Sequence, residues 1–174
     1  MRKILISLVF VFFVFAINAQ VPVKWYTIEE AFAMTKKEPR KIMIDVYTDW
    51  CSWCKVMDSK TFSNQVIADY LNKNFYPVKF NAEQKADVAL NGKVYKFIPS
   101  GTKGYHELAY QLLNGKLGYP SIVFLDENTN MIQLIQTFVE AKPFDAIVRF
   151  FGDDVYKTKK WEDFKSSYVS QVKE

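Results

Sequence analysis

The sequence predicts an α/β fold in which helices flank a central mixed β-sheet. Two observations predict it. Three apolar, strand-like runs, at residues 42–47, 75–80 and 121–125, are separated by segments whose apolar residues recur at helical spacing. After the third run, a polar turn at residues 126–130 and a further run at residues 131–138 predict a hairpin, which a last amphipathic segment follows. This order of elements is that of one layered domain.

The first half of the chain opens with a helix start signal. Thr27 is followed three residues later by Glu30, the pattern of a capping box, which predicts a helix over residues 28–37 that ends before Pro39. Residues 42–47 are then a buried central strand, and Ser52 to Lys60 can continue from it as a helix. Ser63 is the expected N-cap of a helix over residues 64–73, which leads into the strand at 75–80.

The second half is less regular. Residues 83–90 are expected to form a short helix, residues 94–98 a short strand and residues 105–113 a helix. The hairpin of residues 121–125 and 131–138 follows, and a helix begins at Lys142-Pro143 and runs to about Phe151, since proline is tolerated in the first turn. For residues 152–174 we expect a further helix packed on the domain or a partly disordered extension.

The N-terminus has the pattern of a targeting segment. Arg2 and Lys3 precede an apolar stretch over residues 4–17, and Asn18-Ala19-Gln20 resembles a cleavage site. A helix needs about 20 apolar residues to span a bilayer, so this stretch is too short to do so. We therefore expect residues 1–19 to be a signal peptide and the remainder to be a soluble, periplasmic or otherwise exported protein; an uncleaved anchor is the alternative.

The charge balance excludes a nucleic-acid surface. Without Arg2 and Lys3, 21 of the 23 basic residues remain against 19 acidic ones, a net charge near +2. Nucleic-acid-binding domains carry a basic patch or stripe, and no basic run here is interleaved with aromatic residues in that way. We expect no nucleic-acid partner.

Both cysteines of the chain lie in the motif Trp50-Cys51-Ser52-Trp53-Cys54, where the predicted strand meets the next helix. A disulfide between them closes so short a loop that it removes little entropy from the unfolded chain, which argues against a purely structural cross-link. A helix N-terminus lowers the pKa of a thiol, so Cys51 is the expected nucleophile and Cys54, one turn on, the resolving thiol.

Two other interpretations of the cysteine pair remain open, a metal site and inert buried thiols. Structural zinc sites use four ligands, and the chain offers two thiols and one histidine, His106, which is more simply a surface or capping residue. Copper(I) can accept two thiols, so a copper(I)-binding metallochaperone is the alternative function. We expect no resident metal or other cofactor.

Further candidate site residues surround the motif. Asp45 lies within an apolar strand, and a buried acid there would have a raised pKa and could exchange a proton with Cys54; a carboxylate paired with a lysine is the simpler alternative. Asp58, one turn beyond Cys54, could reach the same region. Trp50 is expected to shield the thiols and Trp53 to face partners. Proline directly before a strand, in Tyr119-Pro120, is consistent with a cis peptide bond.

The segments that contain these residues resemble those of the thioredoxin superfamily, and within it the C-terminal periplasmic domain of DsbD-type thiol:disulfide interchange proteins. The similarity covers roughly residues 27–151 and rests on two segments, Asp45–Lys55 with Thr61-Phe62-Ser63, and Tyr119–Asp126. It implies a thioredoxin-like domain over residues 20–151 with Cys51, Cys54, Asp45 and Asp58 as catalytic residues. Trp50, Trp53, Tyr119 and Pro120 would contact the substrate.

The resemblance also implies partners and a direction of electron flow. Substrates would be disulfides of exported proteins, and an upstream thiol donor, soluble or membrane-embedded, would supply electrons. Residues 91–104 make the connection before Tyr119 longer than usual and are expected to be an insertion beside the site. The dipeptide Ser52-Trp53 lacks the histidine of strong oxidants, which favours a reductant.

Overall fold

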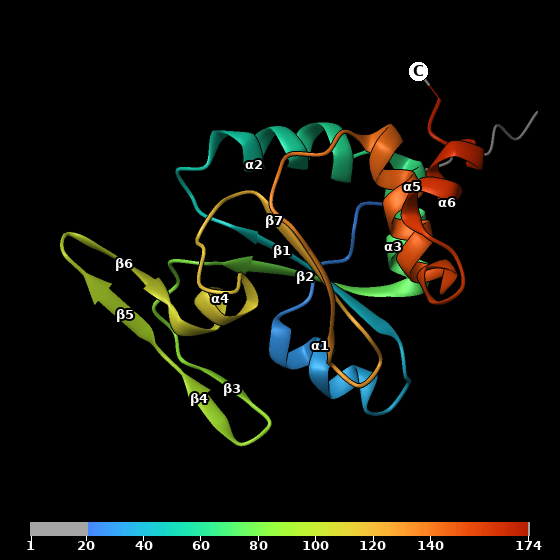
Figure 1. Ribbon diagram of the computed structural model, residues 1–174. Helices are drawn as coiled ribbons and strands as arrows, with labels where there is room; N and C mark the ends of the chain where they lie inside the picture. The colour runs from blue at the N-terminus through green and yellow to red at the C-terminus, as the bar shows by residue number, and fades with distance from the viewer. Residues whose placement is uncertain (1–20, 174) are drawn as a thin grey trace, which may run out of the picture.

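A four-stranded mixed sheet forms the centre of the computed structural model, which describes residues 21–173 (Figure 1). Its strand order is β2-β1-β7-β8. β1 pairs with β2 in parallel and with β7 antiparallel, and β8 pairs antiparallel with β7. The strands are β1 (Lys41–Tyr47), β2 (Phe75–Asn81), β7 (Ser121–Leu125) and β8 (Met131–Ile135). The predicted α/β architecture and all four of its strands are confirmed.

Helices cover both faces of this sheet. The longer ones are α1 (Ile28–Thr35), α3 (Gln65–Asn74) and α5 (Ala141–Gly152); the shorter ones are α2 (Ser52–Met57), the π-helix η1 (Asp58–Phe62), α4 (Glu107–Leu112), the 3-10 helix η2 (Val155–Lys157) and α6 (Trp161–Ser167). Figure 1 shows α2 above the sheet and α1 below it. The capping box at Thr27 is present, with Thr27 and Glu30 each bonding the other's backbone amide.

The alternation of side chains along β1 divides the core in two. Met43 packs with Met57 of α2 and with residues of α3 and α5. Ile42, Ile44 and Val46 pack on the opposite face with residues of α1 and α4. Asp45 has the same parity as Met43, so its carboxylate is directed to the face that α2 covers.

The segment between β2 and α4 differs from the prediction. The expected helix over residues 83–90 is wrong: residues 82–83 are a turn, and Val88–Leu90 is a strand, β3, paired with β4 (Lys93–Tyr95). The expected strand over 94–98 is divided between β4 and β5 (Phe97–Ser100), and β5 pairs with β6 (Lys103–His106). Figure 1 shows the two hairpins extending from one side of the sheet.

Two helix starts also differ from the prediction. α3 is capped by Asn64, whose side chain accepts a hydrogen bond from the amide of Val66, and not by Ser63. The hydroxyl of Ser63, the residue that follows the π-helix, instead donates a hydrogen bond to the carbonyl of Ser59. α4 begins at Glu107 because Tyr105 and His106 belong to β6.

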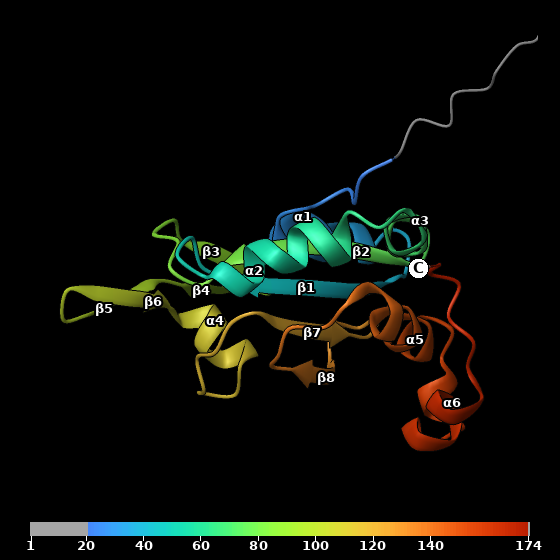
Figure 2. The ribbon, with the colours of Figure 1, turned by 90° about the horizontal axis from the view of Figure 1, so that it is seen from above.

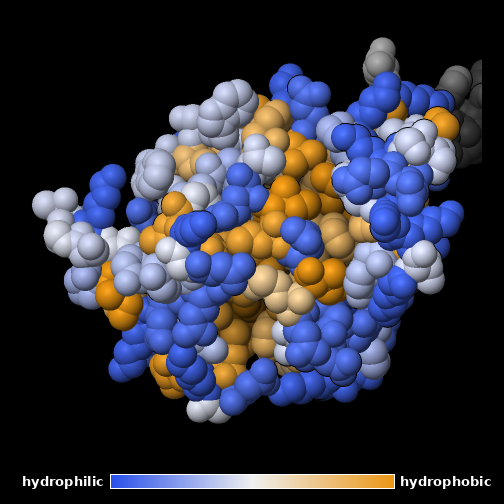
Figure 3. Space-filling view, viewed as in Figure 1, coloured by the Kyte–Doolittle hydropathy of each residue, from blue (hydrophilic) through white to orange (hydrophobic). Residues whose placement is uncertain are grey.

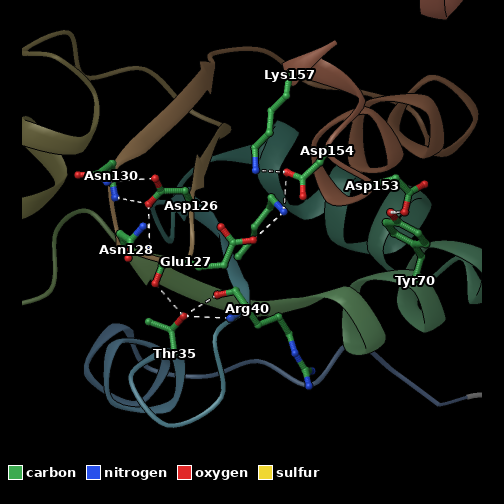
Figure 4. A network of polar contacts seen from close by, with 11 residues as sticks. Thr35, Arg40, Tyr70, Asp126, Glu127, Asn128, Asn130, Asp153, Asp154 and Lys157 are labelled. Atoms are coloured by element: carbon green, nitrogen blue, oxygen red, sulfur yellow. Dashed lines mark hydrogen bonds and ion pairs between the residues drawn. The ribbon is translucent and has the colours of Figure 1, made fainter. Parts of the chain in front are cut away.

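Polar contacts tie the C-terminal segment to the sheet. The buried amine of Lys41 lies 2.8 Å from Glu127 and 2.9 Å from Asp154, which also pairs with Lys157. Thr35 connects Arg40 to the turn between β7 and β8. The Thr35 hydroxyl lies 2.7 Å from the carbonyl oxygen of Arg40 and 3.3 Å from that of Glu127 in this turn (Figure 4). Beyond them, Trp161 and Phe164 of α6 pack on Phe150 of α5.

Apolar side chains gather in the middle of the face shown in Figure 3. Figure 2 shows that β8 forms the edge of the sheet, with α6 at the same side of the molecule. An apolar groove of about 470 Å³ lies between β8, α5 and α6.

None of the helices described in residues 21–173 is both long and apolar enough to cross a bilayer. The signal peptide expected over residues 1–19 lies outside the described residues.

Candidate redox site

Cys51 and Cys54 are joined in a disulfide at the junction of β1 and α2, with an S–S distance of 2.08 Å. Cys51 is the N-cap of α2: its backbone is extended, and its Sγ accepts a hydrogen bond of 3.1 Å from the amide of Cys54. That sulfur therefore faces unpaired amides of the first turn, which favour an anion. Both cysteines are buried, 4% and 2% exposed.

Asp45 lies in the core of β1 and is paired with Lys79. The two are register partners in the parallel β1–β2 pair, and the Lys79 Nζ lies 2.6 Å from Oδ2 of Asp45. Oδ1 of Asp45 is also buried and has no hydrogen-bond partner among the described residues. Asp45 is thus both a buried acid and the partner of a lysine, and its proton exchange with Cys54 stays a prediction.

Lys79 also binds Asp58, the first residue of the π-helix η1. Asp58 is partly exposed, with 45% of its side chain accessible, so the lysine bridges an acid inside the core and an acid at the surface. Asp58 therefore reaches the region of Asp45, as predicted, through Lys79 and not by direct contact.

Burial sets the acidity of the site. It raises the pKa of Asp45 to about 6, although the charge and hydrogen bond of Lys79 act in the opposite direction. Burial alone would lower the pKa of Lys79, but the charge and hydrogen bond of Asp45, with those of Asp58, outweigh it and raise that pKa. Near neutral pH the lysine is therefore a cation and Asp45 is mostly ionised.

Of the four residues expected to contact substrate, Trp50 and Trp53 lie in the cysteine motif, and Tyr119 and Pro120 come directly before β7. Trp50 and Trp53 are 57% and 60% exposed, so both present surface to solvent beside the buried cysteines. The Trp50 ring meets that of Tyr119 edge to face, with centroids 5.9 Å apart, and Trp53 contacts Phe138. The Tyr119–Pro120 peptide bond is cis, and Pro120 is buried.

Three polar residues near the site were not singled out from the sequence. Lys79 stands in an otherwise apolar strand, and that contrast, which drew attention to Asp45, could also have identified it. Glu83 accepts a hydrogen bond from the Trp50 indole, and Lys103 lies over the Trp50 ring. No local pattern indicated those two contacts, because they depend on how the hairpins fold back toward the motif.

His106 caps α4 and does not face the thiols. It is fully buried; its Nδ1 accepts from the amide of Leu108, and its Nε2 lies 3.2 Å from the carbonyl oxygen of Ala86. Within residues 21–173, no group of three or more His, Cys, Asp or Glu side chains is placed to hold a metal ion. A copper(I) site would need only the two thiols, so this result does not test the copper(I) alternative, which stays a prediction.

The chain is similar in sequence to known proteins. The family model "Thioredox_DsbH", described as "Protein of unknown function, DUF255", matches residues 13–151. Spermatogenesis-associated protein 20 of Rattus norvegicus is 37% identical over 89 residues, 50% of this chain and 11% of that protein. The thiol:disulfide interchange protein DsbD of Pectobacterium atrosepticum is 26% identical over 119 residues, 67% of this chain and 17% of DsbD. The chain thus spans less than a fifth of the length of either relative.

Solved structures show the same fold at low sequence identity. A structure described as "DsbH Oxidoreductase" superposes with a TM-score of 0.57 at 15% identity, covering 83% of this chain and 92% of that one. A thioredoxin from Thermus thermophilus gives a TM-score of 0.56 at 18% identity, covering 75% and 88%. The predicted thioredoxin-like fold is confirmed.

Proposed function

The chain belongs to the thioredoxin-like DsbH family, and from that premise we propose that its Cys51–Cys54 pair reduces or exchanges disulfides in other exported proteins. By its fold, its DsbD-like relatives and its disulfide at a strand-to-helix junction, it is a thiol:disulfide oxidoreductase. One observation carries the proposal: Cys51 caps α2, where unpaired amides favour its thiolate.

The reaction moves two electrons from the reduced pair to a substrate disulfide. The Cys51 thiolate attacks one substrate sulfur, forms a mixed disulfide and releases the other substrate sulfur as a thiolate. The Cys54 thiolate then attacks Sγ of Cys51, which releases the second substrate thiolate and forms the Cys51–Cys54 disulfide. A donor thiol pair must reduce this disulfide before the next turnover.

Asp45 has the properties of the proton acceptor for Cys54. It lies on the face of β1 that α2 covers, and its pKa of about 6 leaves it mostly ionised at neutral pH. A base with a pKa just below the working pH accepts a proton and can return it. Lys79 contacts both Asp45 and Asp58 and places one positive charge between the two carboxyl groups.

Three aromatic side chains, of which Trp50 and Trp53 are exposed and Tyr119 is half-buried, form the surface offered to a substrate. Trp50 precedes Cys51 in the chain, Trp53 lies between the cysteines, and Tyr119 precedes the cis proline. Exposed aromatic rings supply contact area at small cost in conformational entropy. A thiol donor, soluble or in the membrane, would need the same surface to reach Cys51, so donor and substrate should compete for it.

The proposal is tested by turnover of a protein disulfide such as that of insulin. Cys51→Ser is expected to abolish dithiol-dependent reduction, because no nucleophile remains. Cys54→Ser is expected to accumulate mixed disulfides between Cys51 and the substrate. Ser59→Ala, an exposed change on η1 outside the motif, is the control and should leave turnover within about twofold of wild type. Unchanged turnover in Cys51→Ser would refute the proposal.

A further inference from the structure

A shallow groove of about 310 Å³ lies beside the candidate redox site, between the motif and the β5–β6 hairpin. Trp50 contributes one side, Lys103, Gly104 and Tyr105 of the hairpin another, and Gly118 and Tyr119 a third. A segment bound there would therefore touch the residue that immediately precedes Cys51. The volume of the groove is at the lower end of the range for ligand pockets, about 300–1,000 Å³, and suits a short stretch of peptide.

The base of the hairpin is joined to the central sheet beside the site. The amide of His106 donates to the carbonyl of Ala82, and the amide of Ala82 donates to the carbonyl of Tyr47, the last residue of β1. The buried His106 ring also meets Phe80 of β2 edge to face, with centroids 5.4 Å apart. These contacts connect the end of β6 to β1, the strand that leads into the cysteine motif.

The groove is lined by one cation, Lys103, and one anion, Glu83, which form no ion pair with each other. The Lys103 Nζ lies 5.2 Å from the centre of the Trp50 ring, and no carboxylate of residues 21–173 forms an ion pair with it. Glu83, the acidic residue of the groove, uses Oε1 to accept a hydrogen bond of 2.9 Å from the Trp50 indole. Residues 81–106 as a whole contain four lysines and two carboxylates.

We propose that the β5–β6 hairpin is a substrate-recognition arm, and that the groove takes an extended segment of a protein substrate with an acidic residue beside the cysteine of its disulfide. The acidic side chain would pair with Lys103, and the aromatic rings of Trp50 and Tyr119 would pack on the backbone and neighbouring side chains. This inference rests on the proposed function and adds a substrate class to it.

The test uses three symmetric peptide disulfides that differ only in the residues flanking the cysteine: glutamate, glutamine or lysine. The second-order rate constant for their reduction by the reduced full-length protein is measured, and each is divided by the rate constant with dithiothreitol to remove intrinsic differences in reactivity. Wild type, Lys103→Glu and Lys103→Gln are compared. Lys37→Glu makes the same charge change at an exposed site beside the end of α1, away from the groove, and is the matched control.

Wild type and Lys37→Glu should reduce the glutamate peptide about fivefold faster than the lysine peptide, the scale of one partly exposed ion pair. Lys103→Gln should remove this preference and Lys103→Glu should reverse it, and about 1 M salt should suppress it in every variant. An unchanged preference in Lys103→Glu, or none in wild type, would overturn the inference. Failure of wild type to reduce any peptide, including the glutamine one, would instead count against the proposed function.

Discussion

Lys79 is the residue on which the electrostatics of the redox site depend. Its amine contacts Asp45 and Asp58 and lies 5.1, 5.0 and 5.5 Å from the ring centres of Trp25, Tyr47 and Phe62. Carboxylates and aromatic faces both favour a cation. Asp45 is left with one buried oxygen that has no partner among the described residues, which disfavours its ionised form. Its pKa of about 6 is the balance of these effects.

Replacing Asp45 by asparagine should stabilise the protein above pH 6. Because the folded-state pKa of Asp45 is raised, the folded protein binds the proton more tightly than the unfolded chain, so stability falls as pH rises from about 4 to 6. An asparagine side chain does not ionise and would avoid this loss, a gain of at most about 3 kcal/mol. Urea unfolding of the oxidised protein at pH 4 and pH 8 measures it. If the free energies of unfolding of variant and wild type differ by the same amount at both pH values, the raised pKa of Asp45 is contradicted.

Replacing Lys79 by methionine should move the pH dependence of turnover upward. Without the lysine, burial and the charge of Asp58 both raise the pKa of Asp45 further, so a higher pH is needed to ionise it. The rate of disulfide reduction measured from pH 5 to pH 9 should rise near pH 6 in wild type and at a higher pH in Lys79→Met. The control is Lys60→Met, an exposed position on η1, which should keep the wild-type profile. A profile unaffected by Lys79→Met would exclude this role for the lysine.

At the level of elements, the junction of α2 with the π-helix η1 connects the cysteine helix to the rest of the fold. η1 begins at Asp58, which binds Lys79, and contains Thr61, whose hydroxyl donates a hydrogen bond of 2.6 Å to the carbonyl of Val139. Thr61 is fully buried. One irregular turn therefore anchors the helix both to β2 and to the segment before α5.

Thr61→Val should weaken that anchor. The substitution keeps the shape of the side chain but leaves the buried carbonyl of Val139 without its donor, a loss of about 1–3 kcal/mol. Ser63→Ala removes a hydroxyl that bonds a carbonyl on the exposed side of the same turn and should cost less than about 0.5 kcal/mol. Urea midpoints of the two variants compare them directly. Equal losses would show that Thr61 contributes no more than a surface residue.

The elements that local patterns predict correctly are those whose signals lie within a few residues. The capping box at Thr27 and the apolar runs of the sheet belong to this class. The helix expected over residues 83–90 failed because Val88 and Leu90 alternate as a strand, and Asn91-Gly92, both with positive φ, make the tight turn to β4. The place of Lys79 in an apolar strand could have identified it, but its contacts with Asp45 and Asp58 depend on strand register. The contact of Lys103 with Trp50 depends on how the hairpin folds, and a single sequence specifies neither.

On the scale of the whole molecule, Asp145 of α5 fastens the C-terminal segment. Its fully buried carboxylate accepts hydrogen bonds from Arg149, Tyr168, Ser170 and the amide of Gln171. Burial would raise the pKa of Asp145, but these bonds outweigh it and hold that pKa below its usual value. Its contribution to stability is therefore present at neutral pH and is lost as pH falls through the folded-state pKa.

Asp145→Ala should release this segment. Removing the carboxylate leaves the other groups of the network without their acceptor, which typically costs about 3–5 kcal/mol for a buried ion pair. Limited trypsin digestion should then cut at Lys165 much faster than in wild type, and the urea midpoint should fall. Glu162→Ala, an exposed change on α6, should alter neither. If trypsin cuts Asp145→Ala at Lys165 as slowly as it cuts wild type, Asp145 does not hold the C-terminal segment in place.

The reduction potential of the Cys51–Cys54 couple tests the central claim most directly. It can be measured by equilibration with thiol–disulfide buffers, using the two cysteines as the only titrating pair. A dithiol that reduces other proteins should have a potential near about −270 mV, as thioredoxin does. A value near about −120 mV would identify an oxidant, and one well below about −300 mV would identify a structural disulfide. Either result would contradict the account.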